Sequence, residues 1–103
     1  MRAITVQRPW GHAIAHLGKD VENRTWNCWL QPGEWLVIHN GQRWSNDAVN
    51  YIHNIVYDAG MNPEEDPAGA IVAVARFAGN VTESDSPWFM GPIGWLLEDV
   101  RVS

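Results

Sequence analysis

Hydrophobic and polar side chains alternate over three short stretches of the chain, which is the pattern of half-buried β-strands. We therefore predict strands over residues 2–6, 20–26 and 95–102. A fourth stretch, Ala70 to Phe77 (AIVAVARF), is apolar almost throughout, so we expect it to be the central strand of a sheet. A short strand over residues 35–39 completes the set, and the chain therefore carries five predicted strands.

Two other stretches repeat their apolar residues every three to four positions, as one face of a helix does. The first spans residues 9–17, with Pro9 suited to a first helical turn and Gly18 to the end of the helix. The second begins after Ser45, a good N-cap residue, and is predicted to end before Gly60.

Turn-forming residues separate these elements. The predicted strand at 35–39 follows a Pro32–Gly33 turn and is expected to end at Asn40–Gly41. Residues 61–68 (MNPEEDPA) are expected to form an exposed loop, with the three acids in solvent, and residues 79–94 a second loop. The predicted order is thus strand, helix, strand, strand, helix, strand, loop and strand.

Five strands and two helices in 103 residues predict a small α+β fold. A closed barrel is favoured over an open sheet because closure removes exposed strand edges. The length fits one domain, residues 1–103. No run approaches the ~20 apolar residues of a membrane span, and the start of the chain lacks a signal-peptide pattern. The expectation is a soluble, cytoplasmic protein with no membrane partner, and its single cysteine, Cys28, is expected to be a buried thiol.

Charge and tryptophan content narrow the possible functions. The formal net charge is −5, and only seven residues are Lys or Arg. A protein that coats a nucleic-acid backbone without sequence preference needs many such cations, so this class of function is disfavoured. A protein that binds one base, a nucleoside or a short single strand is still compatible with this charge. The seven tryptophans favour this class, because an indole ring suits both a core and a stacking platform.

The strongest candidate site is formed by Lys19, Glu22 and Arg24. Residues two apart on a strand point to the same face, so Glu22 and Arg24 share one face, and Lys19 lies just before them. An amine and a carboxylate in one pocket could exchange a proton, and they are the candidate catalytic pair. Glu22 could instead accept a hydrogen bond from a cytosine amino group while Arg24 binds a phosphate or carbonyl group. The alternative is an ordinary ion pair without a function.

Other side chains are candidates for the wall of such a pocket. Trp88 is favoured because it lies in a Pro- and Gly-rich loop, whereas for Trp10, on the apolar stripe of the first helix, core packing is favoured over a place in the pocket. His39 fits a pocket base or a strand-end histidine equally well, and Ser86 either binds a ligand or caps a turn. His12 and His16 share a helical face but lack a third ligand, so we predict no metal site. The complete set of candidate ligand-binding residues is Arg24, Trp10, Trp26, His39, Ser86, Trp88 and Trp95.

Four segments, taken in order, resemble an ASCH domain, a branch of the PUA-like superfamily. QRPWGHAIAHLGKDVENRTW resembles the opening of that family, with its Gln-x-Pro-Trp and Gly-Lys-x-x-Glu-x-Arg motifs. WLVIHNGQRW and GAIVAVARF resemble the next two strands, and SPWFMGPIGWLLEDVR resembles the closing segment. Together they cover nearly all of the chain except the second helix and the acidic loop.

The resemblance implies a PUA-like β-barrel with a cleft beside the first helix and a role in binding RNA or single-stranded nucleic acid, without a cofactor. Some small members of the family are hydrolases that act on N-acylated cytidine, and others act on RNA. In the cytidine branch a threonine follows the lysine by three residues, whereas this chain has Glu22 there and its threonine at Thr25. The resemblance therefore implies a binding module first and a hydrolase of a modified nucleoside or of RNA second, with no oligomeric state indicated.

Overall fold

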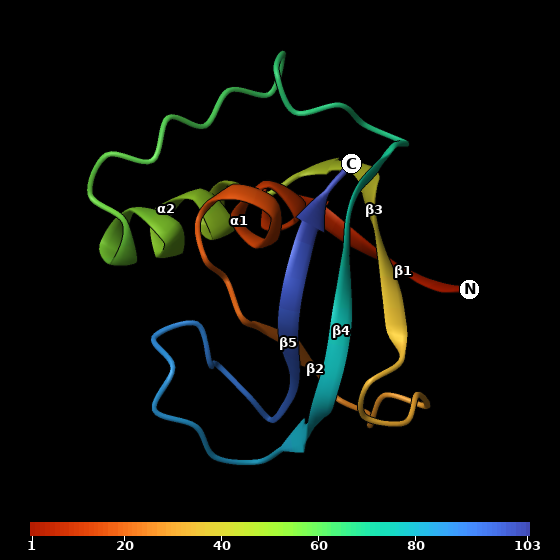
Figure 1. The fold of residues 1–103 in the computed structure, drawn as a ribbon. Helices are drawn as coiled ribbons and strands as arrows, with labels where there is room; N and C mark the ends of the chain where they lie inside the picture. Colours follow the sequence, from red (N-terminus) through yellow and green to blue (C-terminus); the bar gives the residue numbers. More distant parts are fainter.

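The computed structural model describes residues 1–103, which form one five-stranded sheet and two helices (Figure 1). The element order matches the prediction, and the α+β class is confirmed. The elements are β1 (Arg2–Arg8), α1 (Trp10–His16), β2 (Val21–Arg24), β3 (Trp35–Trp44), α2 (Asn46–Ile55), β4 (Ile71–Val81) and β5 (Ile93–Val102).

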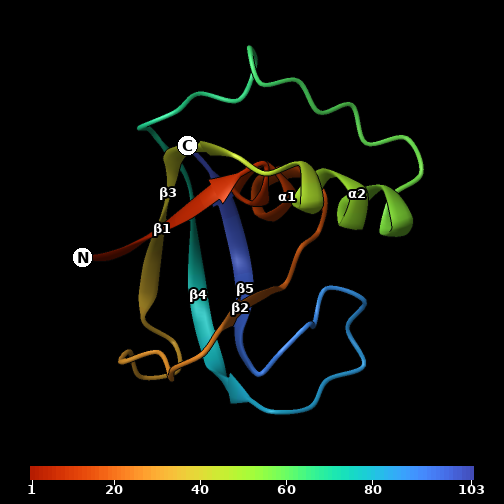
Figure 2. The same ribbon diagram turned by 180° about the vertical axis from the view of Figure 1, so that it is seen from behind.

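The sheet has the strand order β1-β3-β4-β5-β2, so β4 is central, as its apolar sequence predicts. β1 and β3 are parallel, and the other three pairs are antiparallel. The sheet curls into a half-barrel, and seen from behind β2 crosses close to β5 (Figure 2). No strand ladder joins the two edge strands, β1 and β2, so the sheet does not close into a full barrel. Instead, the Arg24 guanidinium on β2 donates a 3.0 Å hydrogen bond from Nη2 to the carbonyl oxygen of Thr5 on β1.

The period-two alternation of each strand places one row of side chains inside the half-barrel. Apolar residues from β1, β3, β4 and β5 meet there, and the largest of them, Trp95 and Phe77, are fully buried. A second, smaller core lies where the two helices meet the loop before β5. Its buried members are Ala13, Val21, Ile52, Ala59 and Trp88.

Three predicted boundaries are wrong by four residues or more, and one of them is the end of β4, which runs to Val81 rather than Phe77. β3 does not end at Asn40–Gly41 but continues to Trp44, because the parallel neighbour β1 still pairs with it at Arg8. α2 begins at the predicted Ser45 cap, whose Oγ accepts a 3.1 Å hydrogen bond from the Ala48 amide. It ends at Ile55 rather than just before Gly60, since Val56 adopts an extended backbone.

The acidic loop is only partly exposed, which corrects the expectation for its third acid. Asp66 is 5% exposed, and its Oδ1 accepts a 2.8 Å hydrogen bond from Nδ2 of the fully buried Asn40. Arg8 donates to the backbone carbonyls of Pro63 and Asp66, at 3.2 and 2.9 Å. A Cβ on Gly11 of α1 would lie 2.0 Å from Asn40 Oδ1, so this close approach requires glycine. These contacts hold the loop against the sheet.

Neither helix of the structure is long and apolar enough to cross a membrane.

Candidate functional site

Lys19 reaches the interior through the turn that ends α1. Gly18 has a φ of +76°, a left-handed conformation that favours glycine. The next amide, Lys19 N–H, then donates a 3.1 Å hydrogen bond back to the Ala13 carbonyl. This turn directs the lysine side chain inward, where only 1% of the residue is exposed.

The Glu22 carboxylate binds two cationic side chains, one at each of its oxygens. Lys19 Nζ lies 3.0 Å from Oε1, and Arg24 Nε lies 3.0 Å from Oε2. Lys19 Nζ also donates to the backbone carbonyl of Val21. The same-face spacing predicted for Glu22 and Arg24 therefore brings all three groups together, and Glu22 itself is 7% exposed.

A cavity of about 260 Å³ opens beside Lys19 and Glu22. The Lys19 ammonium lies 5.1 Å from the centroid of the Trp10 ring, which is within cation–π range. One wall therefore combines an indole, an ammonium and a carboxylate. The lining residues are Trp10, Lys19, Glu22, Asn23, Met90 and Gly91.

The Met90–Gly91 part of the lining is held in place by Asn23, which is not among the predicted site residues. Its Nδ2 donates to the Trp88 carbonyl at 3.0 Å, and its Oδ1 accepts from the amides of Met90 and Gly91 at 2.8 and 3.2 Å. The available signal was an asparagine inside a short strand, where this residue type is disfavoured. Its partners lie more than sixty positions away, so the sequence did not identify them.

The structure exchanges the roles expected for two tryptophans. Trp10 lines the cavity, where its ring also meets Tyr51 edge-on at 5.8 Å between centroids. Trp88 is 4% exposed and belongs to the smaller core. The reason is the turn at Ser86, whose Oγ accepts from the Trp88 amide at 3.2 Å and directs the chain back toward the helices.

The remaining candidates lie outside this cavity. Ser86 also donates a 2.5 Å hydrogen bond from its hydroxyl to Asp20 Oδ1, so it anchors the loop as a turn residue does. His39 pairs with Thr5 across β3 and β1, with 3.1 Å between Nδ1 and Oγ1. Trp26 is 53% exposed, while Trp95 is fully buried and donates from its indole N–H to the Trp26 carbonyl at 2.8 Å. Arg24 lies over both of these rings, 5.6 Å from each centroid.

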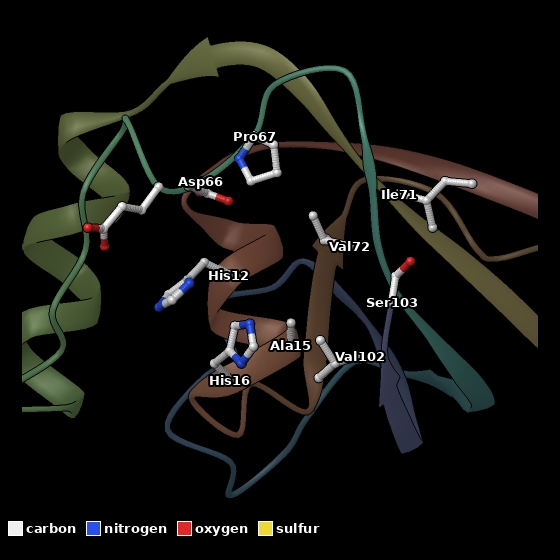
Figure 3. Close-up of a pocket in the computed structure, with 10 residues that line it drawn as sticks. His12, Ala15, His16, Asp66, Pro67, Ile71, Val72, Val102 and Ser103 are labelled. Atoms are coloured by element: carbon white, nitrogen blue, oxygen red, sulfur yellow. The ribbon is translucent and has the colours of Figure 1, made fainter.

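The two histidines of α1 lie beside a different cavity, of about 150 Å³. Figure 3 shows His12 and His16 on one side of it and Asp66 and Pro67 across from them. Partial burial and the neighbouring His16 lower the pKa of His12 below its ordinary value of 6.5, although Asp66 opposes the shift. No group of three or more His, Cys, Asp or Glu side chains is arranged to hold a metal ion.

Cys28 is buried, as predicted, and burial raises the pKa of its thiol. It does not line the candidate cavity.

Comparison of the chain with models of known protein families gives no match, and comparison with curated proteins gives none either.

Proposed function

We propose that this protein is an ASCH-like binding module that takes up a nucleobase of RNA, or of another single strand, in the cavity beside Lys19 and Glu22. The observation that carries the proposal is the chain Lys19–Glu22–Arg24, with both contacts at 3.0 Å, next to an indole-lined cavity. The order of the ASCH-like motifs along the chain supports the same assignment.

Energetics favour a functional reason for these charges. Removing a lysine and a glutamate from water is costly, and apolar residues of similar size often give an equally stable protein. Buried ionisable groups that gather at a cavity are therefore candidates for a functional site. Lys19 and Glu22 meet this description, since they are 1% and 7% exposed and both line the cavity.

The groups in the cavity match the edge of a cytosine-like base. Each Glu22 oxygen accepts one internal hydrogen bond and still has a lone pair for a ligand amino group. Arg24 does not line the cavity but binds Glu22 beside it, and it has further N–H donors for a carbonyl or phosphate oxygen beyond the two that the structure uses. Trp10 provides an apolar wall against which a planar base can pack. Recognition of this kind needs few cations, which agrees with a net charge of −5.

The second candidate is a hydrolase that acts on N-acylated cytidine or on RNA with Lys19 and Glu22 as an acid–base pair. The 3.0 Å contact between Lys19 Nζ and Glu22 Oε1 favours it, because proton exchange requires such proximity. Against it, the threonine of the cytidine-hydrolase pattern has no counterpart in the cavity. Thr25 is exposed and does not line it.

Isothermal titration with cytidine monophosphate tests the binding proposal. We expect binding to the wild-type protein and a loss of about tenfold or more in Glu22→Gln, because a neutral amide cannot replace a carboxylate acceptor of two donors. Lys19→Met keeps the side-chain length and is expected to weaken binding similarly. Glu98→Gln, an exposed carboxylate outside the cavity, is the matched control and should bind normally.

Incubation with N-acetylcytidine and with labelled RNA, followed by chromatography, separates the two candidates. Turnover that disappears in Lys19→Met establishes the hydrolase, whereas binding without turnover establishes the module. Binding that is identical in wild type, Glu22→Gln and Lys19→Met would refute the assignment of this cavity.

A further inference from the structure

Outside the cavity, arginine and tryptophan side chains follow one another along the β2–β3 loop and the adjoining strands. Four of the six arginines and four of the seven tryptophans take part. We call this set the Arg–Trp track. Its members are Arg2, Arg24, Trp26, Trp29, Trp35, Arg76, Trp95 and Arg101.

The track begins at the candidate site. Arg24, which binds Glu22, lies over Trp26 and Trp95. Trp95 meets Trp29 edge-on, with ring centroids 5.5 Å apart, and Arg2 lies 5.6 Å from the Trp29 ring. These contacts between arginine and tryptophan side chains run from Arg24, beside the cavity, into the β2–β3 loop, which leads into the start of β3 (Figure 1).

A shallow groove carries the track onward to β3. It is about 510 Å³ in volume and is lined by Met1, Arg2, Leu30, Glu34 and Trp35. At its far end the Trp35 ring is flanked by Arg76 at 4.1 Å and Arg101 at 5.1 Å. Side-chain contacts therefore connect the Glu22 site with Trp29 and Arg2 through Trp95, which is itself fully buried, and the groove leads on to Trp35.

The exposed parts of the track match single-stranded nucleic acid. Trp26 and Trp29 are 53% and 41% exposed, so each offers indole surface on which a base can stack. Arg2 and Arg101 are exposed and take part in no ion pair, whereas Arg24 and Arg76 are paired with Glu22 and Asp99. Two free guanidinium groups can contact phosphates, and guanidinium planes also stack on bases. Glu34 in the groove opposes phosphate binding nearby, so we expect the charge contribution to be small.

We propose that the Arg–Trp track binds the nucleotides that flank the base in the cavity, so that the ligand is a single-stranded oligonucleotide rather than a free nucleoside. This inference rests on the proposed function for its starting point at Glu22. It adds a second surface whose contribution can be measured separately, because none of Arg2, Trp29 and Arg101 lines the cavity.

Fluorescence titration with cytidine monophosphate and with oligocytidylates of increasing length tests the track. Each stacked base contributes a factor of about five or more in affinity, so a hexanucleotide should bind at least about tenfold more tightly than the monophosphate. Trp29→Leu should weaken hexanucleotide binding by about fivefold or more while leaving the monophosphate affinity unchanged. Trp44→Leu is the matched control, since Trp44 also pairs with an arginine, Arg8, but lies outside the track.

Salt dependence gives an independent readout that a folding defect would not imitate. With two free arginines on phosphates, the slope of log affinity against log salt should be about −1.4 for a single strand. Arg101→Gln should reduce it to about −0.7, whereas Arg43→Gln, an exposed arginine outside the track, should leave it unchanged.

The outcomes separate this inference from the proposed function. If the hexanucleotide binds no more tightly than the monophosphate, or if Trp29→Leu and Arg101→Gln bind it normally, the track proposal is overturned and the cavity assignment stands. If the hexanucleotide binds through the track although the monophosphate does not bind, the track is supported and the cavity assignment fails. Equal binding of polyglutamate, with the same dependence on Arg101, would overturn the nucleic-acid proposal in favour of an acidic protein partner.

Discussion

Two clusters of buried and half-buried polar side chains differ in the partners that they bind. Asn40 binds the Asp66 side chain, and Arg8 and Asn40 donate to backbone carbonyls of residues 63, 66 and 67, so these hydrogen bonds attach a loop to the sheet. Asn40 alone joins Asp66 Oδ1 and the Pro67 carbonyl through its side chain and Ala70 through its amide. The hydrogen bonds of this cluster hold the loop against β1 and β3.

Lys19, Glu22 and Arg24 form two of their four side-chain hydrogen bonds with one another. Lys19 and Glu22 then face a cavity, and only two backbone carbonyls, those of Val21 and Thr5, are bound by the cluster. Both clusters border a cavity, because Asp66 lines the smaller one and Lys19 and Glu22 line the larger one. The clusters differ in how many of their side-chain hydrogen bonds go to the backbone, which is four of five for Arg8 and Asn40 and two of four for Lys19 and Arg24.

The largest expected effect is on the structural cluster. Asn40→Ala removes two side-chain hydrogen bonds and leaves the buried Asp66 carboxylate without its asparagine donor. We expect a loss of about 3 kcal/mol in the free energy of unfolding, measured by urea denaturation. Ligand binding by the protein that stays folded should be unchanged. Asn46→Ala, at an exposed position, should change stability by less than about 0.5 kcal/mol. Equal effects of the two substitutions would contradict the structural role.

A smaller loss of stability, which a second substitution restores, is expected at the candidate site. Lys19→Met should destabilise the protein by about 2 kcal/mol, because Glu22 stays buried with only Arg24 as a cation. Adding Glu22→Leu should recover most of this loss, since apolar replacement of a buried ion pair is often neutral or stabilising. The double variant should nevertheless fail to bind cytidine monophosphate. A double variant that is less stable than Lys19→Met would show that this cluster, too, is mainly structural.

The smallest expected effect is a pH dependence of the folding stability that comes from His12, which lies across the smaller cavity from Asp66. Folding lowers the pKa of His12, so the unfolded chain binds this proton more tightly. Its contribution to stability is therefore complete above about pH 6.5 and is lost as the pH falls through the folded-state pKa. The melting temperature should decrease between about pH 7 and pH 5, and His12→Gln should flatten that decrease. An NMR titration in which His16→Gln leaves the His12 pKa unchanged would exclude repulsion between the two rings.

Much of the fold and part of the site follow from short-range patterns. The alternation of β5 and the helical stripe of α1 identify these elements, because strand and helix geometry repeats every two or about four residues, and a continuous apolar run identifies β4 as a buried strand. The same geometry predicts that Glu22 and Arg24 share a face, and they meet in the structure. The predicted ends of β3 and α2 are wrong. Pairing with β1 extends β3, and the extended backbone at Val56 ends α2.

The sequence by itself determined the element order, the central position of β4 and the proximity of Lys19, Glu22 and Arg24. Each of these depends on residues that are close together in the chain. Only the tertiary structure decided that Trp10, rather than Trp88, lines the cavity, that Asn23 holds Met90 beside it and that Asp66 is buried. These outcomes depend on contacts between residues far apart in the chain, such as Asn23 with Met90, and local periodicity carries no information about such pairs.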